Sequence, residues 1–139
     1  MIIYTIAIIE KAGKILLLLR KNASSYSGYY GVPGGKLDAN ESVADALIRE
    51  MYEEIGIIIT KENMHFTHCL SYKNDQDIEF LSLTFKISHW EGEPFNKEPD
   101  KHEHLAWFYP NALPGNLGPR HRQAVEMTFK NILYSEAGW

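Results

Sequence analysis

Three glutamates, Glu50, Glu53 and Glu54, lie three and four residues apart in the stretch GGKLDANESVADALIREMYEEIGI, residues 34–57. On a helix with about 100° per residue, this spacing places all three carboxylates on one narrow face. Like charges one turn apart repel each other, and a hard divalent cation with oxygen ligands, such as Mg²⁺, would relieve that repulsion. A solvated acidic face on an amphipathic helix is the competing interpretation.

The helix that carries these carboxylates is predicted over residues 41–55. It begins at Asn40 or Ser42, both good N-cap residues, and it ends at Gly56, which can adopt a left-handed conformation. An apolar stripe adjoins the acidic face, so the helix can pack on a core while its glutamates stay outside. The stripe consists of Ala44, Ile48, Met51 and Ile55.

Neighbouring residues in the same stretch can support the carboxylates. Gly34 and Gly35 permit φ > 0 and a close backbone approach, so a tight turn there can aim a carbonyl at the same cation. Arg49 precedes Glu53 by four residues and can hold a carboxylate through two parallel hydrogen bonds. We therefore expect Arg49 to organise the site, and Glu41 to brace the loop and the helix start through hydrogen bonds.

The whole stretch resembles the signature of the Nudix hydrolases, which split nucleoside diphosphates linked to another moiety. The matching positions are Gly35, Glu41, Arg49, Glu50, Met51, Glu53, Glu54, Gly56 and Ile57. The resemblance implies an α+β fold, the Nudix α/β/α sandwich, with a mixed β-sheet and with the Nudix helix and a C-terminal helix on opposite faces. Asn40 replaces a usual glycine, which is a small departure because Asn tolerates the left-handed conformation.

The resemblance also implies a reaction, in which water attacks phosphorus in line and Mg²⁺, or alternatively Mn²⁺, bridges the diphosphate. The implied metal ligands are Glu50, Glu53, Glu54 and the carbonyl of Gly34. Family members often supply one more metal-binding or base carboxylate from the region after residue 90. Glu103 is the first candidate for that carboxylate here and Glu98 the second, although a surface role is an alternative for both.

Candidate substrate contacts flank the signature. Arg20 at a strand end and Lys36 after the glycine pair can meet phosphate oxygens, and each can equally be a solvated charge. Gly35 allows the backbone to approach the substrate, and Tyr29 can stack on a base. Arg120 and its neighbours open the last helix, where an anion can bind, but solvated charges are favoured there.

The substrate itself is not specified by these residues. Small size and a C-terminal run resembling MutT-like Nudix proteins favour a nucleoside triphosphate, ordinary or modified, cleaved to the monophosphate and pyrophosphate. ADP-ribose or another nucleotide sugar is the second possibility and a dinucleoside polyphosphate the third. A non-catalytic nucleotide-binding sensor module is an alternative of another class, but such modules usually lose a carboxylate or the arginine of the signature, and this chain has both.

Composition narrows the class of protein further. The 139 residues predict a single domain over residues 1–139, acting on a small-molecule nucleotide as monomer or homodimer. A net charge of −4 argues against nucleic acid polymers or a membrane as partners. One cysteine, Cys69, excludes an intrachain disulfide, and no targeting or membrane-spanning segment is evident, so we expect a cytoplasmic protein. The histidines show no close metal-ligand spacing, and no zinc site is expected.

The remaining elements follow from apolar periodicity. Residues 2–9 and 15–19 are continuous apolar runs that predict two buried strands forming a hairpin. Further strands are predicted over residues 57–59, 64–73, 78–89 and 105–109. A last amphipathic helix opens at Gly118-Pro119 and is predicted to run toward Gly138, and its expected core face consists of Ala124, Met127, Phe129, Ile132 and Leu133.

Overall fold

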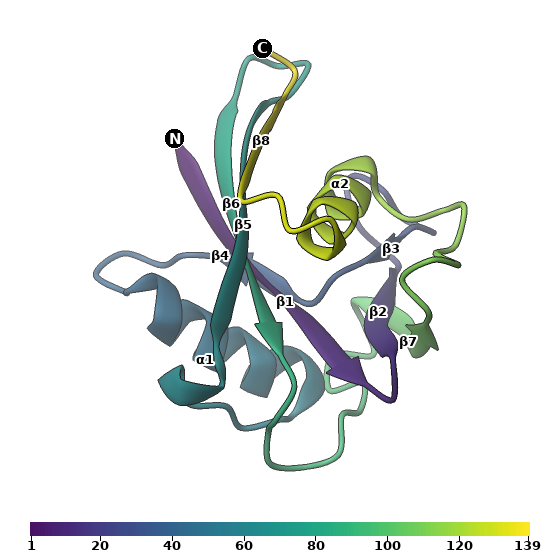
Figure 1. Cartoon of the computed structure of the whole chain (residues 1–139). Helices are drawn as coiled ribbons and strands as arrows, with labels where there is room; N and C mark the ends of the chain where they lie inside the picture. The colour runs from purple at the N-terminus through teal and green to yellow at the C-terminus, as the bar shows by residue number, and fades with distance from the viewer.

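In the computed structural model, which describes residues 1–139, a twisted mixed sheet lies between two helices (Figure 1). Its eight strands follow the order β3-β2-β1-β6-β5-β8, with β4 also paired to β1 and β7 to β2. The pairs β1–β6 and β5–β8 are parallel, and the other pairs are antiparallel. The predicted α+β sandwich is therefore confirmed.

The helices and strands follow one another along the chain without long unstructured gaps, apart from the segment between β6 and β7. They are β1 (Ile2–Lys11), β2 (Lys14–Arg20), β3 (Tyr30–Gly31), β4 (Gly34–Lys36), α1 (Val43–Ile55), a 3₁₀ turn (Lys61–Asn63), β5 (His65–Lys73), β6 (Glu79–Ile87), β7 (His102–Phe108), α2 (Pro119–Phe129) and β8 (Tyr134–Ala137).

The apolar runs of β1 and β2 are explained by burial of both faces of the sheet. Because successive side chains point to opposite faces, Ala7 and Ile9 pack toward α1, whereas Ile6 and Ile8 pack toward α2. Strand β2 divides in the same way, with Leu16 and Leu18 on the α1 side and Ile15 and Leu17 on the α2 side. The two strands pair only at Glu10–Ile15 and Lys11–Lys14, because β4 and the carbonyl of Pro33 occupy the same edge of β1 from Tyr4 to Ala7.

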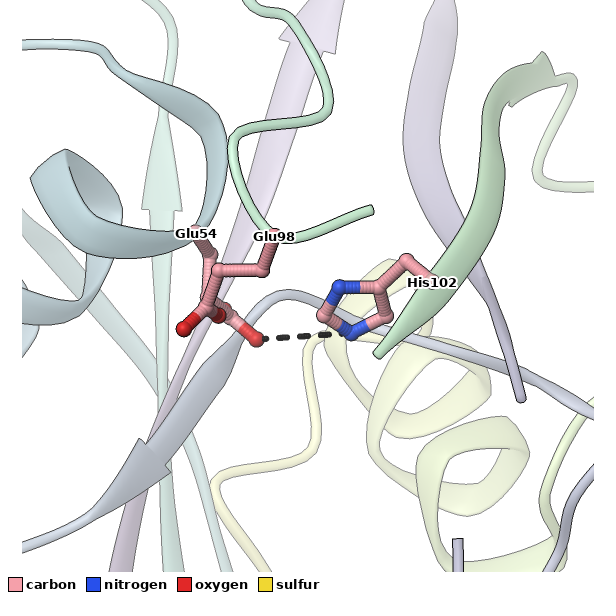
Figure 2. A group of neighbouring side chains, drawn as sticks. All are labelled: Glu54, Glu98 and His102. Carbon is pink, nitrogen blue, oxygen red and sulfur yellow. Dashed lines mark ion pairs between the residues drawn. The ribbon is translucent and has the colours of Figure 1, made fainter. Parts of the chain in front are cut away.

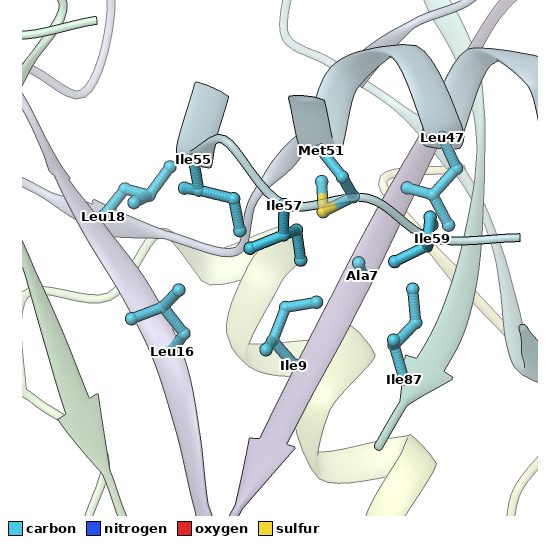
Figure 3. Packing of buried hydrophobic residues seen from close by; sticks show 10 residues of the cluster. All are labelled: Ala7, Ile9, Leu16, Leu18, Leu47, Met51, Ile55, Ile57, Ile59 and Ile87. Carbon is cyan, nitrogen blue, oxygen red and sulfur yellow. The ribbon is translucent and has the colours of Figure 1, made fainter. Parts of the chain in front are cut away.

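Helix α1 is held at both ends as its sequence predicts. The Ser42 side chain accepts a hydrogen bond from the Asp45 amide at 3.0 Å, and Gly56 closes the helix with φ of 68°. Leu47, Met51 and Ile55 are fully buried against β1 and β2 (Figure 3). This packing fixes the rotation of α1, so its acidic face points along the sheet toward the cleft described below.

Two of the predicted elements are wrong. Residues 57–59 form no strand, since only Ile58 makes an isolated bridge, to Glu91, while Ile57 and Ile59 enter the core. The last helix ends at Phe129, and the chain then forms β8 parallel to β5. Its buried residues are Ala124, Val125 and Thr128. Ile132 and Leu133 are exposed because the helix ends before them, and Phe129, its last residue, is exposed as well.

The buried side chain of His68 explains why α2 ends early. Its two ring nitrogens lie 2.6 Å from the carbonyl of Ile132 and 2.8 Å from the hydroxyl of Ser135. These bonds tie the segment after α2 to β5, where a continued helix could not reach them. Neither α1 nor α2 has the length and hydropathy that crossing a bilayer requires.

Candidate active site

A cleft of about 820 Å³ opens beside the acidic face of α1. Its walls also include the Gly34–Gly35 turn, the end of β2, the start of β7, the first turn of α2 and the paired ends of β5 and β6. Glu50, Glu53 and Glu54 all line this cleft. The structure therefore brings the three predicted carboxylates together at an open surface.

Glu54 is the most buried of these carboxylates, at 8% exposure. Its Oε1 accepts a hydrogen bond from the Gly34 amide at 2.7 Å, which joins the glycine turn to α1. Burial raises the pKa of Glu54 well above its usual value, and the nearby charges of Glu50 and Glu98 act in the same direction. A bound cation would replace the proton that such a carboxylate favours.

Arg49 contacts several acidic residues at once. Its Nε and Nη2 donate to the two oxygens of Glu41 at 2.7 and 2.9 Å, a bidentate pair. Its Nη1 donates to Glu50 at 3.0 Å and to Glu53 at 3.2 Å. Glu41 also accepts from the Asp38 amide at 2.9 Å, so it braces the loop before α1. Arg49 thus fixes the orientation of the carboxylates from behind the cleft.

Two carboxylates that bond to Arg49, Glu41 and Glu50, have pKa values shifted in opposite directions. Hydrogen bonds from Arg49 and from the Asp38 amide lower the pKa of Glu41 to about 2. Burial raises the pKa of Glu50, and the opposing effect of Arg49 does not cancel it. Glu50 therefore behaves like Glu54, although it shares the arginine with Glu41.

The glycine pair is required by close packing. Gly34 has φ of 149°, and a Cβ there would overlap the backbone of Thr5 and Ile6 on β1. A Cβ on Gly35 would overlap the carboxylate of Glu50. Gly34 thus lets β4 lie close to β1, and Gly35 leaves room for the Glu50 side chain of α1. The carbonyl of Gly34 as a metal ligand stays a prediction.

Glu98 joins the site from the loop before β7. The Phe95 and Lys97 amides donate to the carbonyls of Ile55 and Glu54 at 3.0 and 3.1 Å, which ties this loop to the end of α1. The carbonyl of Glu98 accepts from the amides of Lys101 and His102, forming a turn. Among the two predicted loop carboxylates, Glu98 lines the cleft, whereas Glu103 is exposed on β7 and lies outside it.

His102 is a site residue that the sequence did not reveal. Glu54, Glu98 and His102 place one potential ligand atom each within 4.8 Å of one another (Figure 2). His102 Nε2 lies 3.8 Å from Glu54 Oε2. Burial lowers the pKa of His102 below its usual value, so its imidazole is neutral near pH 7. The one hint in the sequence was that His102 follows Glu98 by four residues. This spacing brings the two residues into one site only if the chain forms a turn between them.

The predicted substrate contacts divide into two groups. Arg20 and Gly35 line the cleft, as predicted for residues that meet a substrate. Lys36 is exposed outside it, and its carbonyl accepts from Arg49 at 3.3 Å. Tyr29 is also outside the cleft and packs edge-on against Tyr26, which does line it.

An aromatic wall closes the end of the cleft formed by β1, β5 and β6. Tyr72 and Phe80 stack with centroids 4.7 Å apart and planes within 6°, and Tyr4 lies 5.9 Å from Phe80. Arg120 and His121 line the cleft from α2. His121 Nδ1 accepts from the Val32 amide at 2.9 Å, and burial lowers its pKa to about 4. Its imidazole is therefore neutral near pH 7.

The family model of the NUDIX domain matches residues 2–127. This chain belongs to the Nudix family. A CTP pyrophosphohydrolase of Escherichia coli is 34% identical over 116 residues, covering 81% of this chain and 80% of that protein. An ADP-ribose pyrophosphatase of Methanocaldococcus jannaschii is 47% identical over 126 residues, covering 89% of this chain and 72% of that protein.

Solved structures agree with this assignment. The MutT NUDIX hydrolase of Burkholderia pseudomallei superposes with a TM-score of 0.81 at 33% identity, covering 90% of this chain and 95% of that one. The ORF135 protein of Escherichia coli superposes with a TM-score of 0.78 at 28% identity, covering 93% and 89%. The protein is thus a Nudix hydrolase that acts on nucleoside diphosphate derivatives.

Nudix hydrolases generally use a divalent metal ion, and the residues of this cleft suit one. Glu50, Glu54 and Glu98 supply oxygen donors of the kind that Mg²⁺ and Mn²⁺ accept. Two of these carboxylates, Glu50 and Glu54, have raised pKa values, so each stands ready to exchange a proton for a cation. The donor set therefore fits the metal that the family implies.

Proposed function

We propose that this Nudix hydrolase cleaves a nucleoside triphosphate, ordinary or modified, to the monophosphate and pyrophosphate with Mg²⁺ as its metal. The observation that carries the proposal is the convergence of Glu50, Glu54 and Glu98 at one side of a large cleft. Arg20, Lys101 and Arg120 line the same cleft and offer positive charge to an anionic substrate.

The metal would be held by Glu50, Glu54 and Glu98, with Glu53 and the Gly34 carbonyl as further donors. When bound, Mg²⁺ neutralises charge on the phosphate oxygens and lowers the pKa of a bound water. Arg49 keeps Glu50 and Glu53 oriented through its hydrogen bonds, and the Gly34 amide does the same for Glu54. This positioning is in place before the substrate arrives, which removes a reorganisation cost from the reaction.

We assign the general base to Glu98, one of whose carboxylate oxygens would bind the metal while the other would take the proton. Glu98 accepts a hydrogen bond from the exposed Lys101 Nζ at 3.2 Å and none from Arg49, and it keeps 23% of its side chain exposed, so water can reach it. The carboxylate takes a proton from the attacking water as the new P–O bond forms, and the bridging P–O bond breaks with its electron pair leaving on pyrophosphate. Glu54, almost fully buried and bonded to Gly34, is less accessible to that water.

The aromatic wall supports a nucleotide as the substrate. Tyr4, Tyr72 and Phe80 offer ring faces to a base at the end of the cleft formed by β1, β5 and β6, and the carboxylates of α1 line the same cleft. The relative named CTP pyrophosphohydrolase supports a triphosphate. So does a relative named 8-oxo-dGTP diphosphatase from Haemophilus influenzae, 34% identical over 86 residues and covering 62% of this chain and 61% of that protein.

ADP-ribose is the second candidate substrate, favoured by the 47% identity to the relative named ADP-ribose pyrophosphatase. Its cleavage would give AMP and ribose 5-phosphate, with the same carboxylates and the same general base. Dinucleoside polyphosphates and other nucleotide sugars would use this chemistry too. They differ only in what occupies the cleft beyond the diphosphate.

A substrate panel tests these proposals. The purified protein is incubated with Mg²⁺ and single ribo- and deoxynucleoside triphosphates, 8-oxo-dGTP, ADP-ribose and a dinucleoside tetraphosphate. Pyrophosphatase reveals pyrophosphate, and alkaline phosphatase reveals new phosphomonoesters from ADP-ribose. We expect the largest kcat/KM for a triphosphate and none with EDTA. Larger values for ADP-ribose would reject the triphosphate proposal, and nucleotide binding with no cleavage at all would favour the sensor module.

A further inference from the structure

The neutral imidazole of His102 stands among the carboxylates without a hydrogen-bonding partner on either nitrogen. Its Nδ1 is buried and makes no hydrogen bond. Its Nε2 lies 3.8 Å from Glu54 Oε2, which is beyond hydrogen-bond range. Polar side chains this deeply buried nearly always make a hydrogen bond, so a histidine that is 8% exposed and makes none points to a ligand, and Nε2 is the nitrogen that lies near the carboxylate of Glu54.

The backbone around His102 holds this ring in place. The His102 amide donates to the Glu98 carbonyl at 3.0 Å, and the His102 carbonyl accepts from the Asn96 side chain at 2.8 Å. His102 also pairs with Arg20 at the point where β2 and β7 shift register. The backbone of His102 is thus held by the loop that precedes it and by β2, and its ring faces Glu54 and Glu98 (Figure 2).

The spacing of the donors suits a common cation. Metal–nitrogen and metal–oxygen bonds are about 2.0–2.2 Å long, so two donors on one ion lie at most about 4 Å apart. The Nε2–Oε2 distance of 3.8 Å falls within that limit, and all three donors of Glu54, Glu98 and His102 lie within 4.8 Å. Small side-chain rotations would bring the set onto one ion.

We propose that His102 donates its Nε2 to the cation site, which makes it a mixed carboxylate–imidazole site. Such a site binds a first-row transition ion more tightly, relative to Mg²⁺, than carboxylates alone would, because imidazole suits these ions and Mg²⁺ prefers oxygen. The inference rests on the proposed metal-dependent function and deepens it by naming the class of metal that this chain selects.

Metal binding without nucleotide tests the proposal. Mn²⁺ is added to the wild type, His102→Gln and His89→Gln, and the electron spin echo of the bound ion is examined for coupling to ¹⁴N. His89 is the matched control, because it is an exposed imidazole outside the cleft. We expect nitrogen coupling in the wild type and in His89→Gln, and its loss in His102→Gln. Coupling that persists in His102→Gln, or that is absent from the wild type, overturns the proposal.

Calorimetric titration gives the second readout. His102→Gln is expected to lose about tenfold in affinity for Co²⁺ while its affinity for Mg²⁺ changes less than about twofold. Unchanged Mg²⁺ binding also shows that the carboxylates are still assembled. Glu98→Gln is expected to weaken both ions, since it removes an oxygen donor. Equal losses for Co²⁺ and Mg²⁺ in His102→Gln would mean that the ring only supports the fold. None of these measurements depends on which nucleotide is cleaved.

Discussion

The acidic residues of the site fall into two groups that the protein treats differently. Glu41 bonds to Arg49 through both of its oxygens, and its pKa is lowered to about 2. Glu54 receives only a backbone amide in a buried position, and its pKa is raised well above the usual value. A carboxylate whose charge is neutralised by arginine binds a cation weakly. A buried carboxylate that receives only a backbone hydrogen bond binds a cation more tightly.

Glu50 lies between the two groups and shows which effect is stronger. It accepts a hydrogen bond from Arg49 at 3.0 Å, yet burial still raises its pKa. Desolvation thus outweighs a single charged hydrogen bond at this depth. Arg49 and Glu41 thus brace the site through hydrogen bonds, and we propose that Glu50, Glu54 and Glu98 carry the chemistry. Four experiments test this division.

Glu54→Gln should have the largest effect on catalysis, lowering kcat by several orders of magnitude. The raised pKa of Glu54 means that its contribution to stability is full below its unfolded value of 4.5 and is lost as pH rises through the folded value. The metal-free variant should therefore be more stable than the wild type at pH 8. Steady-state kinetics with Mg²⁺ and thermal unfolding in EDTA measure both effects, and near-wild-type turnover would reject the assignment.

Glu98→Gln should lower kcat by about 10²- to 10⁴-fold, the usual range for loss of a general base. Glu103→Gln, a neighbouring change at an exposed site on β7, should alter kcat less than about twofold. The two variants are compared by kcat across a pH series. Equal losses would show that the loop as a whole matters, and not the carboxylate in the cleft.

Arg49→Lys should act more mildly on kcat, by about 10²-fold, because lysine keeps the charge but loses the planar fork. The unfolding free energy should fall slightly, since Glu41 loses its bidentate partner. Denaturant titration and Mg²⁺ binding measure these effects. A variant with unchanged Mg²⁺ affinity and kcat would show that Arg49 does not orient the carboxylates.

Glu41→Gln should have the smallest effect, seen in stability against pH. Because the pKa of Glu41 is lowered from 4.5 to about 2, its contribution is present above pH 4.5 and is lost as pH falls toward 2. Wild type should therefore be more stable than the variant at pH 7, and the two should converge near pH 2. Unfolding monitored by circular dichroism at each pH tests this, and a constant difference would contradict it.

Most of the acidic helix and its two ends could be predicted from the sequence, because they depend on contacts between residues close together in the chain. Helical periodicity placed Glu50, Glu53 and Glu54 together, and cap chemistry fixed the ends of α1 at Ser42 and Gly56. The predictions that were wrong concern the segments 57–59 and 130–137. The structure of these segments depends on contacts with residues distant in the sequence. Residues 57–59 contact Glu91, and residues 130–137 contact His68.

What the sequence alone determined is the acidic helix, the glycine turn beside it and the family to which both belong, since these lie within 24 consecutive residues. The tertiary structure decided which distant groups join them. In the folded chain Glu98 lines the cleft and Glu103 does not, and His102 lies beside Glu54 and Glu98. Tyr4, Tyr72 and Phe80 form one wall of the cleft. The physical reason is that these contacts depend on strand pairing and loop docking, which no local period records.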